Sequence, residues 1–212
     1  MRKKLSVAAG IMSMIVVALT LWLCSYASGT GMKINDSKAN EAGETLTRFF
    51  DCLKAEQWDE AYGCLYNYST LGLETEPEDE LSARFWQAQK QVWDFRISDD
   101  WTLDGTDIRR QVTVRGLNMD AIRADISTGV QALLEEAVET ARLKSDVYDE
   151  NGEYREEVAV AALNQAAGDV LGHISDYTAD RELKVDMRLR DGAWRVCAGK
   201  ELLSALTSGA VR

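Results

Sequence analysis

The spacing of hydrophobic and polar positions changes along the chain. Apolar residues at i, i+3, i+4 and i+7 mark one face of a helix, and this spacing occurs over residues 46–53, 58–65 and 81–92. The first two stretches are separated by a short break near Glu56, which predicts an antiparallel helical hairpin. We therefore expect three helices in the first part of the domain.

The period then changes from 3.6 to 2, which is typical of half-buried strands. Alternation over residues 93–97 and 112–114 is interrupted by Asp104-Gly105, and alternation over 183–190 is followed by Asp191-Gly192. Both dipeptides favour tight turns, so each predicts a β-hairpin. Between the hairpins, residues 119–137 and 160–174 return to helical spacing and predict a helical pair.

This order predicts an α+β domain over residues 41–206. Three N-terminal helices would pack on a mainly antiparallel sheet, and a helical hairpin at 118–178 would be inserted between the strands. Gly168 and Gly172 are four residues apart and would let another helix pack closely against this one. Each glycine weakens a helix by about 1 kcal/mol, so a packing reason for them is expected. Residues 29–40 are small, polar and aperiodic and predict a flexible tether, and residues 207–212 a C-terminal tail.

The chain opens with Arg2-Lys3-Lys4 and then an uncharged run from Leu5 to Met32. Leu5 to Cys24 is long enough to cross a lipid bilayer, which needs about 20 apolar residues. Three interpretations remain: a retained anchor, a lipoprotein signal with lipidation at Cys24, and a signal cleaved after Ser25-Tyr26-Ala27 within segment 1–28. Cationic residues stay on the cytoplasmic side, so all three place the following domain outside the cytoplasm, held at or exported through the cell membrane.

Charge bears on possible partners. The formal net charge is −11, and the three cations of the opening leave the remainder more acidic still. Such a surface repels nucleic acid, so we expect no nucleic-acid partner. One predicted sheet face is nevertheless basic and would pair with the domain's own acidic helices, face solvent or receive an anionic partner. Its residues are Arg109, Arg115, Lys184, Arg188, Arg190 and Arg195.

Three cysteines follow the opening segment. In the predicted helical hairpin, Cys52 and Cys64 would have Cα atoms about 6.3 Å apart, within the range for a disulfide. An exported chain permits such a bridge. The alternative is two half-buried, small apolar side chains, and Cys197 stays unpaired in either case.

Few residues point to catalysis or to a metal. His173 is the one histidine, so no histidine-based triad or two-histidine metal motif can be assembled. The acidic tract 74–80 is interpreted as a helix start with a Thr75–Glu78 capping box. The loop 149–152 lacks carboxylates at the first and last positions of a calcium loop. We therefore name no catalytic residue, metal site or cofactor.

The element order, with Gln57-Trp58-Asp59-Glu60-Ala61-Tyr62 at the first helical junction and Asp191-Gly192-Ala193-Trp194-Arg195-Val196 near the end, resembles the nuclear transport factor two-like, cystatin-like α+β superfamily. It is most similar to membrane-tethered, exported bacterial members. The resemblance implies a curved sheet wrapped around the first helices into a cone whose mouth holds a ligand or a catalytic site. The acidic, tyrosine or histidine motifs of ketosteroid isomerase and polyketide cyclase relatives have no match here, so no site residue is transferred.

Two hypotheses for function follow. The first is a non-enzymatic, extracytoplasmic module that binds another cell-envelope protein or a small apolar ligand, with Trp58, Tyr62, Phe85 and Trp93 as pocket candidates. The second is a cofactor-independent isomerase, dehydratase or cyclase, which would need an acid beside a tyrosine in an open pocket. One fold hosts many functions, so the resemblance does not decide between them.

Overall fold

The computed structural model describes residues 35–67 and 70–208 and has an α+β fold. The predicted membrane segment Leu5–Cys24 and lipidation site Cys24 lie outside these residues. Within the described part, no helix is both long and apolar enough to cross a bilayer. The described residues from Asn40 onward belong to one compact unit, and the features below lie in it, except for the first residues of the N-terminal helix.

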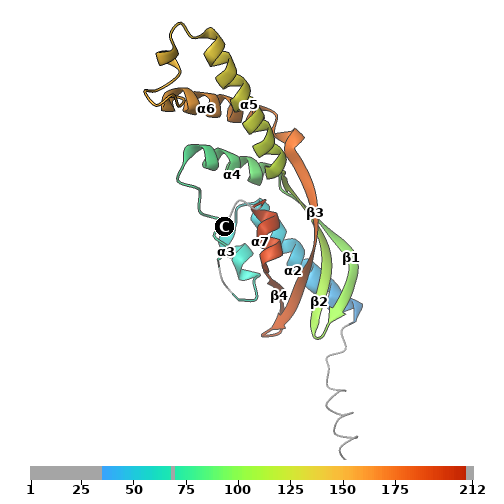
Figure 1. The fold of residues 1–212 in the computed structure, drawn as a ribbon. Helices are drawn as coiled ribbons and strands as arrows, with labels where there is room; N and C mark the ends of the chain where they lie inside the picture. The colour runs from blue at the N-terminus through green and yellow to red at the C-terminus, as the bar shows by residue number, and fades with distance from the viewer. Residues whose placement is uncertain (1–34, 68–69, 209–212) are drawn as a thin grey trace, which may run out of the picture. The chain divides into compact units, whose positions relative to one another are not determined.

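Six α-helices and one four-stranded antiparallel sheet make up the described residues (Figure 1). The helices are α2 (Asp36–Lys54), α3 (Trp58–Gly63), α4 (Glu80–Val92), α5 (Met119–Thr140), α6 (Glu156–Gly172) and α7 (Lys200–Leu206). The strands, in their spatial order, are β1 (Asp94–Asp104), β2 (Asp107–Leu117), β3 (Thr178–Arg190) and β4 (Ala193–Cys197). Short 3₁₀ turns cover Lys144–Asp146 and Ile174–Tyr177.

Both predicted β-hairpins are confirmed. Gly105 has φ +64° in the turn between β1 and β2. Asp191 (φ +52°) and Gly192 (φ +79°) turn β3 into β4. In this second turn both central residues have positive φ, which aspartate, asparagine and glycine adopt most readily. The alternating apolar positions of β2 and β3, which include Val112 and Val185, are buried on one face of the sheet.

Helices α2 and α7 lie on that buried face (Figure 1). Phe50 of α2 stacks on Phe95 of β1 with ring centroids 4.4 Å apart, and α7 packs against β2 and β3. The buried side of α7 consists of Leu202, Ala205 and Leu206. Helix α7 was not predicted, although its apolar residues have helical spacing. Burial also continues past the expected end of the domain at residue 206, to Thr207 and Ser208.

Two predicted helix starts were wrong. Helix α2 begins at Asp36, inside the expected tether, because Asn35 accepts a hydrogen bond from the Lys38 amide at 3.2 Å. Helix α4 begins at Glu80, with Asp79 as its N-cap accepting from the Ser82 amide at 2.8 Å, so the predicted Thr75–Glu78 capping box does not form. In both cases a single capping side chain determines the boundary.

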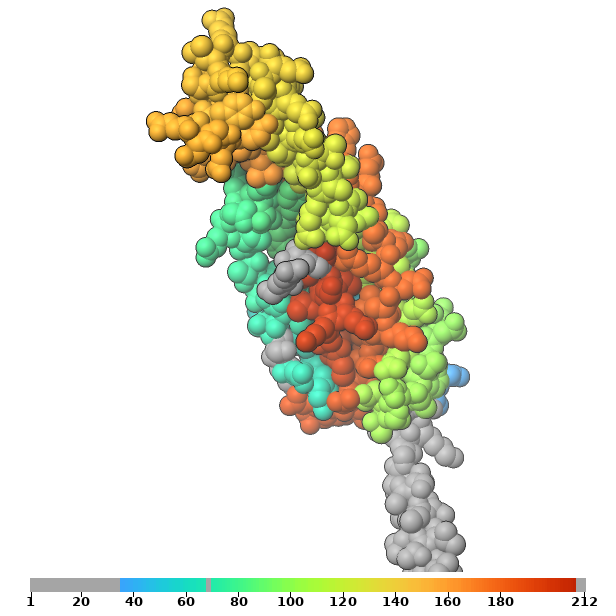
Figure 2. Space-filling view, viewed as in Figure 1, coloured from blue at the N-terminus to red at the C-terminus, as the bar shows by residue number. Residues whose placement is uncertain are grey.

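The inserted helical pair is confirmed, since α5 and α6 come between β2 and β3 along the chain. Figure 2 shows this pair beyond α4, with its tip directed away from the strands. Its base packs on α4 in an apolar cluster that includes Ala88, Leu117, Ile122 and Val170. The predicted close approach at Gly168 and Gly172 was wrong, because a Cβ at either position would meet nothing within 4 Å.

The close approach occurs instead at Gly129 of α5. A Cβ placed there would lie 3.1 Å from the Cβ of Ala166 on α6. The two helices therefore come together where a glycine on one faces an alanine on the other. Which glycine contacts the partner helix depends on how the two helices rotate against each other, and this rotation cannot be derived from the glycine spacing in one helix.

The basic residues on the outer sheet face pair with neighbouring groups rather than with acidic helices. Antiparallel register places Arg109 opposite Asp186 and Arg115 opposite Asp180. The Arg109 Nε lies 2.6 Å from Asp186 Oδ1, and the Arg115 Nε lies 2.8 Å from Asp180 Oδ1. Opposite charges facing each other across strands stabilise a sheet modestly.

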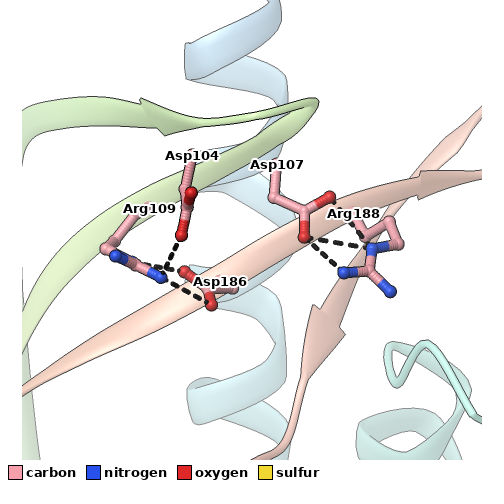
Figure 3. Close-up of polar contacts among 5 residues, drawn as sticks. All are labelled: Asp104, Asp107, Arg109, Asp186 and Arg188. Carbon is pink, nitrogen blue, oxygen red and sulfur yellow. Dashed lines mark hydrogen bonds and ion pairs between the residues drawn. The ribbon is translucent and has the colours of Figure 1, made fainter.

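Arg109 also reaches Asp104 at 2.7 Å, and Arg188 contacts the buried Asp107 at 2.6 Å (Figure 3). Toward the end of β3, Arg190 donates to the Tyr66 carbonyl at 2.5 Å, and Arg195 of β4 donates to the Gly63 carbonyl. Carboxylates thus pair with Arg109, Arg115 and Arg188, while Arg190 and Arg195 donate to backbone carbonyls.

Candidate functional site

An apolar pocket of about 280 Å³ lies beside α4, where four parts of the chain meet. One wall is α4, and the segment that precedes it forms a second. The junction of β2 and α5 forms a third, and Thr207 after α7 forms the fourth. The lining residues are Gly72, Leu73, Thr75, Pro77, Ser82, Phe85, Trp86, Gln89, Leu117, Met119 and Thr207.

Helix α4 presents one continuous face to this pocket. Ser82, Phe85, Trp86 and Gln89 are spaced i, i+3, i+4 and i+7, so they fall on the same side of the helix. Trp86 and Gln89 are buried, whereas Ser82 is exposed at the mouth. The cap at Asp79 fixes where this helix starts.

Gln89 links three elements through its buried side-chain amide. Its Oε1 accepts from the Leu117 amide at 2.7 Å and from the Ser208 hydroxyl at 2.8 Å, and its Nε2 donates to the Leu206 carbonyl at 2.9 Å. A Cβ at Gly116 would lie only 2.6 Å from Nε2, so glycine is needed there. These bonds hold α4, the end of β2 and the end of α7 together around the pocket.

Trp86 within α4 and Trp93 at its C-cap differ in their polar contacts. The Trp93 indole Nε1 donates to the Leu206 carbonyl at 3.0 Å. The Trp86 ring meets the Trp93 ring edge-on, with centroids 5.6 Å apart. The Trp86 Nε1 is buried and has no hydrogen-bond partner among the described residues.

Tyr62 of α3 anchors the wall formed by residues 72–77. Its hydroxyl donates to the Glu74 carboxylate and accepts from the buried Leu73 amide at 3.2 Å. Burial raises the pKa of Tyr62 to about 12, and the adjacent Glu74 charge adds to the increase. The phenol therefore stays protonated at neutral pH and holds the loop in place.

The four predicted pocket residues occupy different positions. Phe85 lines the pocket directly. Trp93 lies behind it and supports Trp86, and Tyr62 supports the wall through Leu73. Trp58 packs at a tilt against Tyr62, with ring centroids 6.4 Å apart, and is one layer further away. Of the four predicted side chains, Phe85 alone lines this pocket.

Several lining residues were not predicted, in particular Trp86, Gln89 and Thr207. Trp86 lies next to Phe85 in sequence and could have been found from its size. Gln89 is four residues after Phe85, on the same helix face, but its polarity suggested the surface. Thr207 was assigned to the C-terminal tail, and only the tertiary fold brings it to the pocket.

The lining is chemically neutral. Among the described residues that form it, none is Asp, Glu, His, Lys or Arg. The exposed Glu74 lies outside the lining, and His173 is exposed at the end of α6, with Nδ1 3.0 Å from the Asp169 carbonyl. Within residues 35–67 and 70–208, no group of three or more metal-ligating side chains is arranged around a metal position. The arrangement can enclose an apolar molecule and offer it hydrogen bonds.

A larger depression of about 970 Å³ lies at the tip of the α5–α6 pair. It is open, and charged side chains such as Arg142, Lys144 and Arg155 contribute to it. A small apolar molecule there would keep much of its contact with water. The smaller pocket beside α4 therefore fits such a ligand better, because burial of apolar area drives its binding.

The cysteines give no sign of a site. Cys52 and Cys64 are buried free thiols in the structure, so the considered bridge is not formed there, and Cys197 is also free. The Cys64 thiol donates to the Glu60 carbonyl at 3.4 Å, and burial raises its pKa. A raised pKa lowers the thiolate fraction, which is the reactive form.

Comparison with known proteins found no matching family model, no matching curated protein and no matching solved structure.

Proposed function

We propose that this protein is a non-enzymatic, extracytoplasmic binding module, tethered through Leu5–Cys24, whose pocket beside α4 takes a small, mainly apolar molecule. The observation that carries the proposal is the apolar pocket, built by residues from four separate parts of the chain and free of ionisable side chains in its described lining. Resemblance of the element order to the nuclear transport factor two-like superfamily agrees with this proposal, because ligand sites in that superfamily lie between the first helices and the sheet.

The catalytic alternative has less support. An isomerase or cyclase of this kind needs a proton donor or acceptor within reach of the bound molecule. Tyr62 and Glu74 form a tyrosine–carboxylate pair behind one wall, but neither residue lines the pocket. Their contacts explain the pair as an anchor for residues 72–77, so binding is the function that the geometry favours.

Thermal unfolding with toluene as a neutral probe tests the proposal. A ligand that binds only the folded chain stabilises it by RT ln(1 + [L]/Kd), which is about 1.4 kcal/mol at ten times Kd. We expect toluene to raise the Tm of the wild type. Ser82→Trp, which places a large side chain at the mouth, should abolish this rise.

Arg84→Trp provides the matched control. Arg84 is exposed on the same helix but does not line the pocket, so the toluene-induced rise in Tm should persist in this variant. The proposal is wrong if toluene has no effect on the wild type, or if Ser82→Trp and Arg84→Trp retain the same rise.

A further inference from the structure

The lining of the pocket beside α4 has a buried part and an exposed part. Five lining residues are buried and form its inner part: Leu73, Trp86, Gln89, Leu117 and Thr207. Four others are exposed and form its mouth: Gly72, Thr75, Pro77 and Ser82. A molecule bound here therefore has one end surrounded by protein and the other end close to water.

The polar side-chain groups of the inner part are bonded within the protein or out of a ligand's reach. Gln89 Oε1 accepts two hydrogen bonds, and its Nε2 donates one. The Thr207 hydroxyl donates to the Leu203 carbonyl at 3.0 Å. The Trp86 Nε1 has less than 1 Å² of accessible surface. The buried end of a ligand is therefore hydrocarbon, because a polar group buried without a partner costs free energy.

The volume of the pocket, about 280 Å³, sets the size of that hydrocarbon end. An apolar cavity of about 150 Å³ holds one benzene molecule. The pocket beside α4 therefore has room for one ring with a short alkyl chain. Such a chain can carry a polar head group out to the mouth, where the head group keeps its contact with water.

The chain segment on one side of the mouth is strongly acidic. Three exposed glutamates each adjoin at least one lining residue in the sequence: Glu74, Glu76 and Glu78. Their carboxylates therefore lie within about 10 Å of the mouth, which is the Debye length at about 0.1 M salt. Neither Glu74 nor Glu78 forms an ion pair with a described residue, and Glu76 lies 3.9 Å from Lys90 Nζ, which also pairs with Glu56. Most of this negative charge is thus left unbalanced.

We propose that the ligand is a small cationic amphiphile, with an apolar ring or short chain in the pocket and an ammonium group at the mouth beside Glu76 and Glu78. This inference rests on the proposed function and adds the charge of the ligand. Burial of the apolar end supplies the affinity. The glutamates select the head group, because their field attracts a cation and repels an anion. The net charge of −11 acts in the same direction.

Three probes with the same apolar body separate the head groups. Phenylpropylammonium carries a cation, phenylpropanol a neutral hydroxyl and phenylpropanoate an anion. We would measure their dissociation constants in low salt for the wild type and for two double variants, Glu76→Gln/Glu78→Gln and Glu136→Gln/Glu139→Gln. The second variant is the matched control, since it also removes two charges, from exposed residues of α5 outside the pocket lining.

We expect the wild type to bind the ammonium probe at least about tenfold more tightly than the carboxylate probe. Glu76→Gln/Glu78→Gln should lower this ratio at least about threefold, and the control variant should leave it unchanged. The affinity for phenylpropanol should be the same in all three proteins, which shows that the pocket is intact. Raising the salt concentration to about 0.3 M should also lower the ratio, because salt screens the carboxylates.

The outcomes distinguish the two proposals. If phenylpropanol binds the wild type but the charged probes bind equally well, only this inference is overturned. It is also overturned if the two double variants give the same ratio, because the preference would then come from the net charge and not from the mouth. If neither toluene nor any of the three probes binds the wild type, the proposed function is wrong and this inference with it.

Discussion

Tyr62 shows how one side chain can connect a helix, a loop and the pocket behind them. Tyr62→Phe removes both hydroxyl contacts and leaves the buried Leu73 amide without its partner. We expect the free energy of unfolding to fall by about 1–2 kcal/mol in urea denaturation at pH 8. Tyr177→Phe is the control, because it removes an exposed hydroxyl bond to Asp125 and should cost less than about 0.5 kcal/mol.

The raised pKa of Tyr62 also predicts a pH dependence. Below about pH 10 this phenol is neutral in both states. Between there and the folded-state pKa of about 12, the unfolded chain loses a proton that the folded chain keeps. Stability is therefore lost as the pH rises through this window. Urea denaturation at pH 8, 10 and 11 should show a smaller loss for Tyr62→Phe than for the wild type; equal losses would contradict this assignment.

Gln89 is the second residue on which the site depends. Gln89→Leu keeps the approximate volume but leaves the Leu117 amide and the Ser208 hydroxyl without their acceptor. We expect a loss of about 2–4 kcal/mol in the free energy of unfolding. Gln87→Leu, on the same helix but exposed to solvent in its contact with Glu76, should stay within about 0.5 kcal/mol of the wild type. Similar effects of the two changes would argue against the central role of Gln89.

At the level of elements, the α5–α6 pair offers a direct comparison between two glycines. Gly168→Ala adds a methyl group to open space inside a helix and should raise the free energy of unfolding by about 1 kcal/mol. Gly129→Ala places its Cβ 3.1 Å from that of Ala166 and should lower it, because the helices must separate. Chemical denaturation of both variants checks the sign, and a gain of equal size at both positions would contradict the observed contact.

The elements that the sequence predicted well are those specified by local patterns. Alternation with Asp-Gly turns located both β-hairpins, and helical spacing located α4, α5 and α6. The boundaries failed where one capping residue decides them, as at Asn35 and Asp79. Helix α7 was missed because it is short and its few apolar residues are buried only by packing on the sheet.

The candidate site was predictable only in part, for a related reason. Phe85 was identified because a large aromatic residue on an apolar helix face suggests a core or pocket. Trp86 and Gln89 depend on which side of α4 faces β2, and Thr207 depends on where α7 ends. These relations arise from tertiary packing between residues far apart in sequence.

At the level of the whole molecule, the proposed topology places the tip of the α5–α6 pair outside the cell membrane. Asn151 is exposed in that tip, and the native Cys52 and Cys64 thiols are buried. We expect Asn151→Cys to react with a membrane-impermeant maleimide in intact cells well above the wild-type background. Labelling that requires permeabilised cells would reverse the orientation.

The edge strand β1 contains an irregularity that affects whether another copy of the chain can pair with it. Its register shifts between Ile97 and Trp101, and the buried Arg110 donates to the Ser98 and Asp99 carbonyls there at 2.9 and 3.2 Å. At the opposite edge, Leu65 already pairs with Val196 of β4. The β1 edge is thus irregular and acidic, and Leu65 already pairs at the β4 edge. Neither edge offers a straight template for a strand from another copy. Sheet edges of this kind would hinder cross-β aggregation between copies of the chain.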